Sequence, residues 1–237
     1  MRIAVLGGTG NAGAAVLAEA LARGHEVRAL VRTPATLTTA HPRLTVVPGG
    51  FEDSDALDRT IDGVDAVITA IGVTSAQRPT LLVDSVTAIR SAMRRAGVER
   101  LVIVQGVHLA FPGDPRNPGL ALLKAVLRIA MRPLTLDGRA LGALLAQDPS
   151  DWTVVRMPRL VAGDATGRAL TGRLHVSPRS SVTSGDVAAF ALGCVEGDEH
   201  SRRMPMIASA GARAAAEPAS DRATDRIPAD PPRSSYP

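Results

Sequence analysis

Aromatic residues and cysteine are scarce in this chain of 237 amino acids. Aromatics make up 2% of it. Proteins that bind single-stranded nucleic acid stack bases on aromatic side chains, so the composition argues against that function. The single cysteine, Cys194, excludes an intramolecular disulfide and any metal cluster built on cysteines. Cys194 lies within an apolar helical pattern, so we expect a buried structural thiol and not a nucleophile.

Lysine is almost absent as well. Lysine and arginine together number 27, and Lys124 is the only lysine. Because almost nothing titrates between neutrality and the arginines, the sequence pI of 10.4 is high although the formal net charge is only +4. The arginines are scattered, so we expect no nucleic-acid partner. The five histidines are scattered too, and we expect no metal site.

Long apolar runs are also missing. None approaches the roughly 20 residues that a membrane-spanning helix needs, so we expect no membrane partner. Glycines and Asn11 interrupt the apolar region after Leu6, which is not typical of a signal peptide. We therefore expect a soluble cytoplasmic protein. Hydrophobic residues make up 45% of the chain, which is enough to bury a full core.

A glycine-rich turn near the start of the chain lies between an apolar run and an alanine-rich stretch. In the spacing G-x-x-G-x-x-G, the first glycine permits a tight turn, and the second lets the backbone approach a pyrophosphate. The third lets the helix pack close to the strand. Free N–H groups and the positive end of the helix dipole would face the anion. The sequence predicts a dinucleotide site with contacts from Gly7, Thr9, Gly10, Asn11, Ala12 and Gly13.

Apolar runs alternate with helical patterns through the first two-thirds of the chain. The runs are short and continuous, which is typical of parallel strands buried on both faces. The expected strands are 2–6, 26–31, 44–47, 65–70, 100–105 and 152–156, and the expected helices are 11–23, 53–61, 80–96 and 136–147. The alternation predicts an α/β fold with a doubly wound parallel sheet, the Rossmann fold, and ligands at the carboxyl ends of the strands.

Two later segments leave strands at that edge and are expected to border the ligand. The proline-rich stretch 106–118 cannot be regular structure, and 157–172 is expected to behave in the same way after the sixth strand. A helix at 185–196, capped by Ser184, is expected to precede a short strand near 203–207. Core-forming residues then nearly vanish. We expect a single domain over residues 1–207, which includes the substrate crevice, and a disordered tail over 208–237.

The choice of cofactor depends on the residue that ends the second strand. An acidic residue there binds the 2′-hydroxyl of NAD, whereas an arginine favours the 2′-phosphate of NADP. The residue is Arg32, and no acid lies between Val27 and Thr39, so the sequence favours NADP(H). The alternative is that Arg32 is one more solvated surface arginine.

Further cofactor contacts are expected where the third, fourth and fifth strands end. Phe51 follows the third strand and is expected either to flank the adenine or to belong to the core. The end of the fourth strand is small and apolar enough to let the diphosphate and ribose pass. The contacts expected from the fourth and fifth strands are Ala70, Ile71, Gly72 and Gln105.

Several motifs resemble the atypical short-chain dehydrogenase/reductase group of NAD(P)H-binding proteins. Within it the chain is most similar to the biliverdin-IXβ/flavin reductases and the bacterial NmrA-like proteins, over roughly residues 1–207. The group's motifs are not specific to any substrate. The segments that carry the resemblance are 5–13, 29–32, 98–104, 152–160, 165–167 and 184–188.

Most dehydrogenases of the wider superfamily use a Tyr-x-x-x-Lys pair as acid/base. Here the only tyrosine is Tyr236 and the only lysine is Lys124, so the pair does not exist. The resemblance to flavin reductases implies a route without that tyrosine, in which NADPH delivers hydride to a bound planar acceptor such as a flavin or a quinone. In that branch a serine follows the fifth strand and a histidine follows the sixth; here Gly106 and Arg159 hold these positions.

The expected acceptor pocket contains His108, Phe111 and Arg159, and no catalytic residue is assigned. Arg159 cannot act as a general acid near neutrality but is able to hold an anionic acceptor. His108 is titratable, although a lone loop histidine is more often incidental. Two functions stay open: an NADPH-dependent oxidoreductase, for which a tailoring step on an aromatic polyketide is a variant, and a non-catalytic NADP(H)-binding regulator of the NmrA-like kind. The expected partner is a small planar molecule, and we expect a monomer or a weak dimer.

Overall fold

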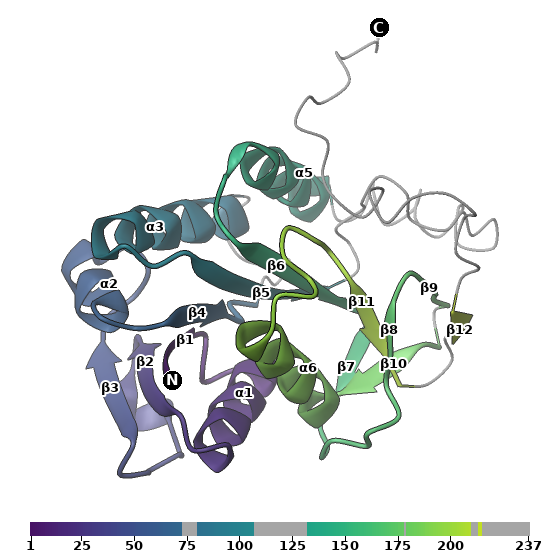
Figure 1. Ribbon diagram of the computed structural model, residues 1–237, viewed down its shortest axis with the longest axis horizontal. Helices are drawn as coiled ribbons and strands as arrows, with labels where there is room; N and C mark the ends of the chain where they lie inside the picture. Colours follow the sequence, from purple (N-terminus) through teal and green to yellow (C-terminus); the bar gives the residue numbers. More distant parts are fainter. Residues whose placement is uncertain (73–79, 107–131, 178, 210–212, 215–237) are drawn as a thin grey trace, which may run out of the picture.

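The computed structural model describes residues 1–72, 80–106, 132–177, 179–209 and 213–214 (Figure 1). Its main sheet has eight strands in the order β3-β2-β1-β4-β5-β6-β11-β8. All neighbours are parallel except the edge strand β8, which is antiparallel to β11. The order reverses between β1 and β4, which confirms the predicted Rossmann fold. The bounds are β1 Arg2–Leu6, β2 Glu26–Val31, β3 Leu44–Pro48, β4 Ala66–Thr69, β5 Arg100–Gly106, β6 Trp152–Met157, β8 Leu170–Gly172 and β11 Met206–Ala208.

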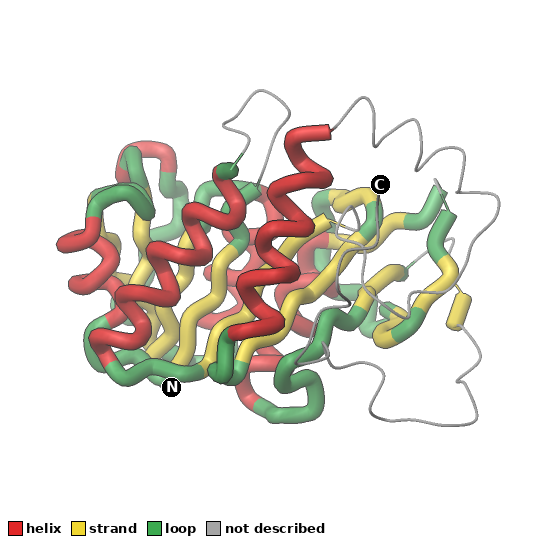
Figure 2. Tube along the Cα trace, turned by 90° about the horizontal axis from the view of Figure 1, so that it is seen from above, coloured by secondary structure: helices red, strands yellow, loops and turns green. Residues whose placement is uncertain are grey.

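Helices cover both faces of this sheet (Figure 1). On one face α1 (Asn11–Ala22) and α6 (Ser184–Glu196) pack side by side. On the other face lie α2 (Ser54–Ile61), α3 (Leu81–Ala96) and α5 (Arg132–Gln147). Figure 2 shows the layer of helices over the strands from above. No helix in the described part of the chain is long and apolar enough to cross a membrane.

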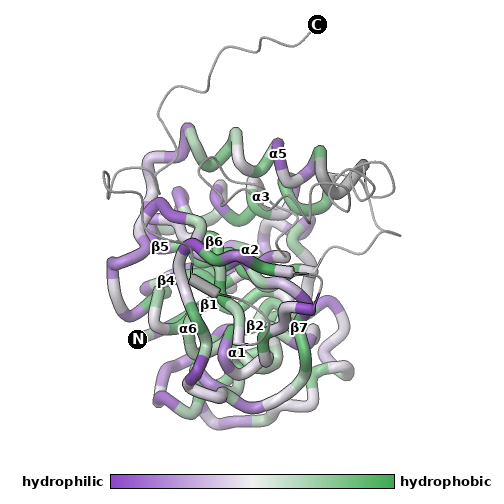
Figure 3. The backbone as a smooth tube through the Cα atoms, turned by 90° about the vertical axis from the view of Figure 1, so that its right-hand side faces the viewer, coloured by the Kyte–Doolittle hydropathy of each residue, from purple (hydrophilic) through white to green (hydrophobic). Residues whose placement is uncertain are grey.

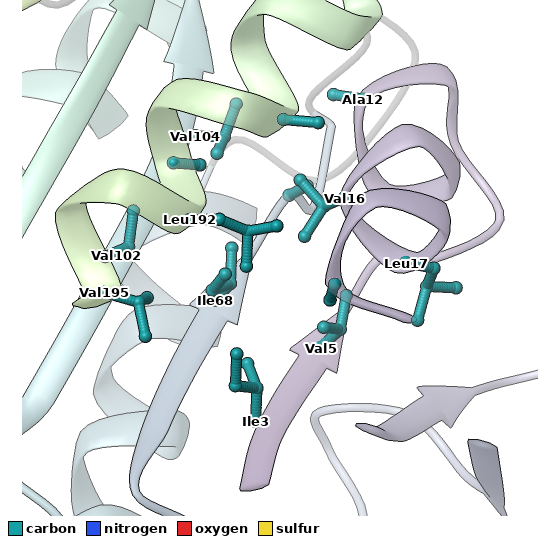
Figure 4. Packing of buried hydrophobic residues seen from close by; sticks show 14 of the residues in the cluster. Ile3, Val5, Ala12, Val16, Leu17, Ile68, Val102, Val104, Leu192 and Val195 are labelled. Carbon is teal, nitrogen blue, oxygen red and sulfur yellow. The ribbon is translucent and has the colours of Figure 1, made fainter. Parts of the chain in front are cut away.

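The strands are apolar at consecutive positions, which explains why helices cover both faces of the sheet. Along β1, Ile3 and Val5 face α1 and α6, while the alternate residues face α2 and α3. Figure 4 shows the first of these two cores, where Val16 of α1 and Leu192 of α6 meet over the strands. The hydropathy colouring of Figure 3 follows the same arrangement, with hydrophobic residues along the inner strands. The central strands are therefore fixed from both sides, which holds their carboxyl ends in place.

Two small sheets extend the main one beyond β6. β7 (Arg159–Val161) pairs in parallel with β10 (Ser181–Thr183), and β9 (Leu174–His175) pairs with β12 (Arg213–Ala214). The expectation that 157–172 lacks regular structure is therefore wrong, because the segment contains β7 and β8. Each of these strands has three residues and pairs with a segment later in the chain. Strands this short carry no usable periodicity of their own.

The boundaries near the end of the domain also shift. The strand expected at 203–207 is β11, and the helix expected from 136 begins at Arg132. The cap of α6 is Thr183 and not Ser184, since Thr183 Oγ1 accepts from Asp186 N at 3.1 Å. The structure runs past the expected boundary at residue 207 to β12, whereas 210–212 and 215–237 of the expected tail lie outside the described residues.

Candidate functional site

The turn between β1 and α1 has the geometry of a phosphate cradle. Gly7 has a φ of +81°, and a Cβ added there would come within 2.6 Å of the Ala70 carbonyl at the end of β4. A Cβ on Gly13 would overlap the Gly7 carbonyl oxygen, so α1 begins tightly against the turn. Gly10 N donates to Gly7 O at 3.1 Å, and Gly10 O accepts the first helical bond at 2.7 Å. The N–H groups that precede this bond, and that lack a helical acceptor, are those of Asn11, Ala12 and Gly13.

The helix termini at this edge differ in charge. Asp53 caps α2 with a hydrogen bond of 2.9 Å. Asp137 reaches from α5 to accept two N–H groups of α3 at 2.7 and 2.9 Å, and Asp186 lies in the first turn of α6. By contrast α1 is capped by Gly10, without a side-chain bond and without an acid in its first turn. Because a carboxylate offsets the positive end of the helix dipole, α1 is the one of these four helices that keeps that end for an external anion.

The cradle therefore fits the pyrophosphate of a dinucleotide. Two observations support this fit. The backbone around Gly7 and Gly13 leaves no room for a Cβ atom at either position, and the start of α1 has no side-chain cap. Thr9, Gly10 and Asn11 are exposed there. Gly8 packs closely against α1 as well, since a Cβ on it would come within 2.6 Å of Leu17 Cδ1 and the Leu17 side chain would have to shift.

Arg32 lies where the ribose next to the adenine is expected. It follows β2 directly and is exposed. A Cβ added to Gly50 would lie 3.4 Å from Arg32 Cγ and 2.7 Å from Glu52 Oε2. Within the described residues the Arg32 guanidinium forms no ion pair. Glu52 is thus a neighbouring acid that the sequence reasoning missed, because it follows β3 and not β2.

The Gln105 side chain links the carboxyl end of β5 to the segment that follows β4. Gln105 is buried, and its Nε2 donates to Ile71 O at 3.0 Å. Its amide nitrogen therefore fixes the backbone that follows β4. A Cβ on Gly72 would meet no atom of the described residues within 4 Å. Phe51 is half-buried in the loop after β3, beside the same edge.

On the acceptor side, His108 and Phe111 lie outside the described residues. Arg159 is exposed at the start of β7. A second arginine, Arg156, was missed: it is buried at the end of β6, its Nε donates to Met204 O at 2.8 Å, and it pairs in register with Gln105. In the sequence, Arg156 stands out as the one charged residue of the otherwise mostly apolar strand β6.

Cys194 lies away from this edge, near the end of α6. Burial raises the pKa of its thiol to about 12. A thiol with that pKa supplies almost no thiolate near neutrality. The expectation that Cys194 is buried is confirmed.

Comparison with known proteins agrees with this geometry. The chain is 26% identical over 209 residues to the uncharacterized protein YwnB of Bacillus subtilis, covering 84% of this chain and 94% of YwnB. It is 33% identical over 125 residues to a 3 beta-hydroxysteroid dehydrogenase/Delta 5→4-isomerase of Mycobacterium tuberculosis, covering 48% of this chain and only 34% of that protein. A protein from Lactobacillus casei has a similar structure, with a TM-score of 0.71, 27% identity and coverage of 89% of this chain and 100% of that one.

A family model described as NAD(P)H-binding matches residues 7–198. The match begins at the first glycine of the cradle and reaches past the end of α6, so it includes nearly every element of the described domain. The chain belongs to the NAD(P)H-binding family.

Proposed function

We propose that the protein is an NADPH-dependent oxidoreductase that acts on a planar acceptor such as a flavin or a quinone. The observation that carries the proposal is the uncapped start of α1 over the glycine turn. Its three free N–H groups would hold the pyrophosphate, Arg32 would face the 2′-phosphate, and Gln105 would fix the backbone beside the nicotinamide ribose. When bound, the nicotinamide supplies the hydride.

A planar conjugated acceptor suits the residues of this chain better than an isolated carbonyl. Reduction of a carbonyl produces an alkoxide, which needs a proton donor such as the tyrosine of the missing Tyr-x-x-x-Lys pair. A flavin or a quinone spreads the added charge over its ring system, so orientation is the main demand on the protein. The dehydrogenase named above, 33% identical over part of its length, supports redox chemistry with this cofactor class.

Consumption of NADPH tests the proposed activity. Purified full-length protein, NADPH and one of FMN, FAD or menadione should lose the NADPH absorbance faster than the same mixture without protein. Tight NADPH binding without turnover of any of the three acceptors would contradict the proposed oxidoreductase activity. That result would instead favour a non-catalytic regulator of the NmrA-like kind, which senses the cofactor and acts through a partner.

The preference for NADPH is tested with two neighbouring variants. We expect Arg32→Ala to weaken NADPH binding by about tenfold and to leave NADH binding unchanged, because only NADPH carries the 2′-phosphate. Glu52→Gln is the matched control, since it removes the nearby carboxylate and keeps the arginine. Fluorescence titrations of the wild type and both variants with NADPH and with NADH give the dissociation constants to compare. If Glu52→Gln weakens NADH binding and Arg32→Ala changes neither constant, the cofactor is NAD and the proposal for Arg32 is wrong.

A further inference from the structure

One buried carboxylate holds the loop that follows β7. Asp186 Oδ1 accepts from Thr166 N at 2.8 Å and from Gly167 N at 3.2 Å. Its Oδ2 accepts from Thr166 Oγ1 at 2.7 Å and from Ser209 Oγ at 2.6 Å. Burial alone would raise the pKa of Asp186, but these hydrogen bonds outweigh burial and hold the pKa below its ordinary value. The group is therefore an ionised acceptor near neutrality.

The same loop touches the start of α6 at further points. Gly185 N donates to Gly163 O at 2.9 Å, and the Ser184 hydroxyl donates to the same oxygen at 3.1 Å. A Cβ on Gly185 would overlap the backbone of Ala165. Residues 161–168 are nevertheless exposed, so apolar burial contributes little to their position. Hydrogen bonds to the start of α6 fix the loop.

The direction of α6 places this contact at the edge of the sheet that carries the cradle. Arg23, after the end of α1, pairs with Glu196 at the end of α6 at 2.7 Å. The two helices lie side by side, so both run in the same direction and both begin at the carboxyl ends of the strands. The loop also follows β6 and β7, in the half of the sheet that faces the nicotinamide in a doubly wound fold.

We infer that Asp186 is a positioning residue for the acceptor: it fixes loop 162–168 to the start of α6, so that the loop bounds the place where the acceptor meets the nicotinamide. The inference rests on the proposed function for the identity of the acceptor. Asp186 itself is buried and acts only through the loop.

Two hydroxyls that bind the same carboxylate oxygen give a matched pair of variants. Thr166→Val removes the hydroxyl bond from the loop to Asp186 and also the bond of 3.2 Å that Thr166 Oγ1 accepts from Arg168 N, whereas Ser209→Ala removes a bond to Asp186 that comes from the end of β11. Asp186→Asn tests the carboxylate directly, and Asp198→Asn is its control, because Asp198 is exposed and its side chain makes no hydrogen bond within the described residues. A variant that releases the loop is thereby compared with one that changes the hydrogen bonding of Asp186 and leaves the loop contacts in place.

Trypsin gives a measurement that needs no turnover. Arg168 lies in the exposed loop, and cleavage after it is identified by the mass of the fragments. We expect Thr166→Val and Asp186→Asn to raise that cleavage rate about fivefold or more, and Ser209→Ala and Asp198→Asn to leave it near the wild-type rate. Equal rates in all five proteins would overturn the anchoring role.

Binding of FMN in the presence of saturating NADP⁺ tests the link to the acceptor. Quenching of flavin fluorescence should show an FMN dissociation constant about fivefold higher in Thr166→Val and Asp186→Asn, with NADPH affinity unchanged. Faster cleavage with unchanged FMN affinity would make the loop structural only and overturn the proposal, as would a wild-type protein that binds no FMN. A wild-type protein that binds FMN and does not reduce it would refute the proposed enzyme alone.

Discussion

Gly10 and Gly13 belong to one spacing but meet different demands. A Cβ on Gly13 would overlap the Gly7 carbonyl oxygen, whereas a Cβ on Gly10 would lie 3.6 Å from the same atom, an ordinary contact. We expect Gly13→Ala to lower the stability of the protein without cofactor by about 1 to 3 kcal/mol. Gly10→Ala should leave that stability near the wild-type value and weaken NADPH binding about tenfold, because its methyl group stands where the pyrophosphate approaches. Thermal melts and NADPH titrations of both variants check this, and equal melting temperatures without cofactor would contradict it.

Individual site residues could be predicted from the sequence where their role depends on near neighbours. The glycine spacing is such a case, since it is defined within one strand–turn–helix unit, and the role of Arg32 stays a prediction drawn from the same unit. Glu52 was missed because it approaches Arg32 from the end of another strand. Gln105 was expected as a cofactor contact, and its bond to Ile71 O is visible only once β4 and β5 lie side by side. Pairing of strands distant in sequence leaves no local signal.

At the scale of elements, α3 depends on a residue of α5 for its first turn. Asp137 is 2% exposed and accepts from Leu82 N and Val83 N. We expect Asp137→Ala to lower the free energy of unfolding by about 2 to 3 kcal/mol, because one buried and one partly buried N–H group lose their acceptor. Asp84→Ala is the control, since Asp84 is an exposed acid of the same first turn whose carboxylate accepts, among the described residues, from Thr80 alone. Urea unfolding measures both, and an equal loss in the two variants would refute the role of Asp137.

The long elements could be predicted because their patterns repeat within them. The strands at 2–6 and 26–31 match β1 and β2, and the helix at 80–96 differs from α3 by one residue. Prediction failed for β7 and β8, which are too short for a period and are defined by partners later in the chain. The cap of α3 by Asp137 could not be predicted from the sequence either, because Asp137 and Leu82 are 55 residues apart in the chain.

Across the whole molecule, charged contacts close the edge of the sheet opposite the cradle. Glu196 binds both Arg23 and His25, which ties the end of α6 to the end of α1 and the start of β2. Arg100, at the start of β5, donates to Asp151 Oδ1 at 2.9 Å and to Cys194 O. At the cradle edge, by contrast, the start of α1 is left uncapped. At the same edge Asp53, Asp137 and Asp186 lie at the starts of α2, α3 and α6, so the start of α1 is the place left for an anion among these four helices, which is consistent with a cofactor site at the carboxyl ends of the strands.

The stability of the molecule should fall at acidic pH through two buried aspartates. Asp148 forms a bidentate pair with Arg90 at 2.6 and 3.0 Å. Burial alone would raise the pKa of Asp148, but its hydrogen bonds from Arg90 and Ser150 outweigh burial, so the pKa of Asp148, like that of Asp186, lies below the ordinary 3.8. A pKa that is lower in the folded state gives stability that is present above the unfolded value and lost as the pH falls through the folded value.

The urea midpoint should therefore decline as the pH falls below about 4, where the unfolded chain takes up protons first. Asp148→Asn should lower the midpoint near neutrality, because Arg90 loses its charged partner in a buried place. It should also decline less between about pH 5 and 3, since one of the two responsible carboxylates is gone. Asp198→Asn, which changes an exposed carboxylate, should keep the wild-type slope. A slope in Asp148→Asn as steep as that of the wild type would show that the acid sensitivity arises elsewhere.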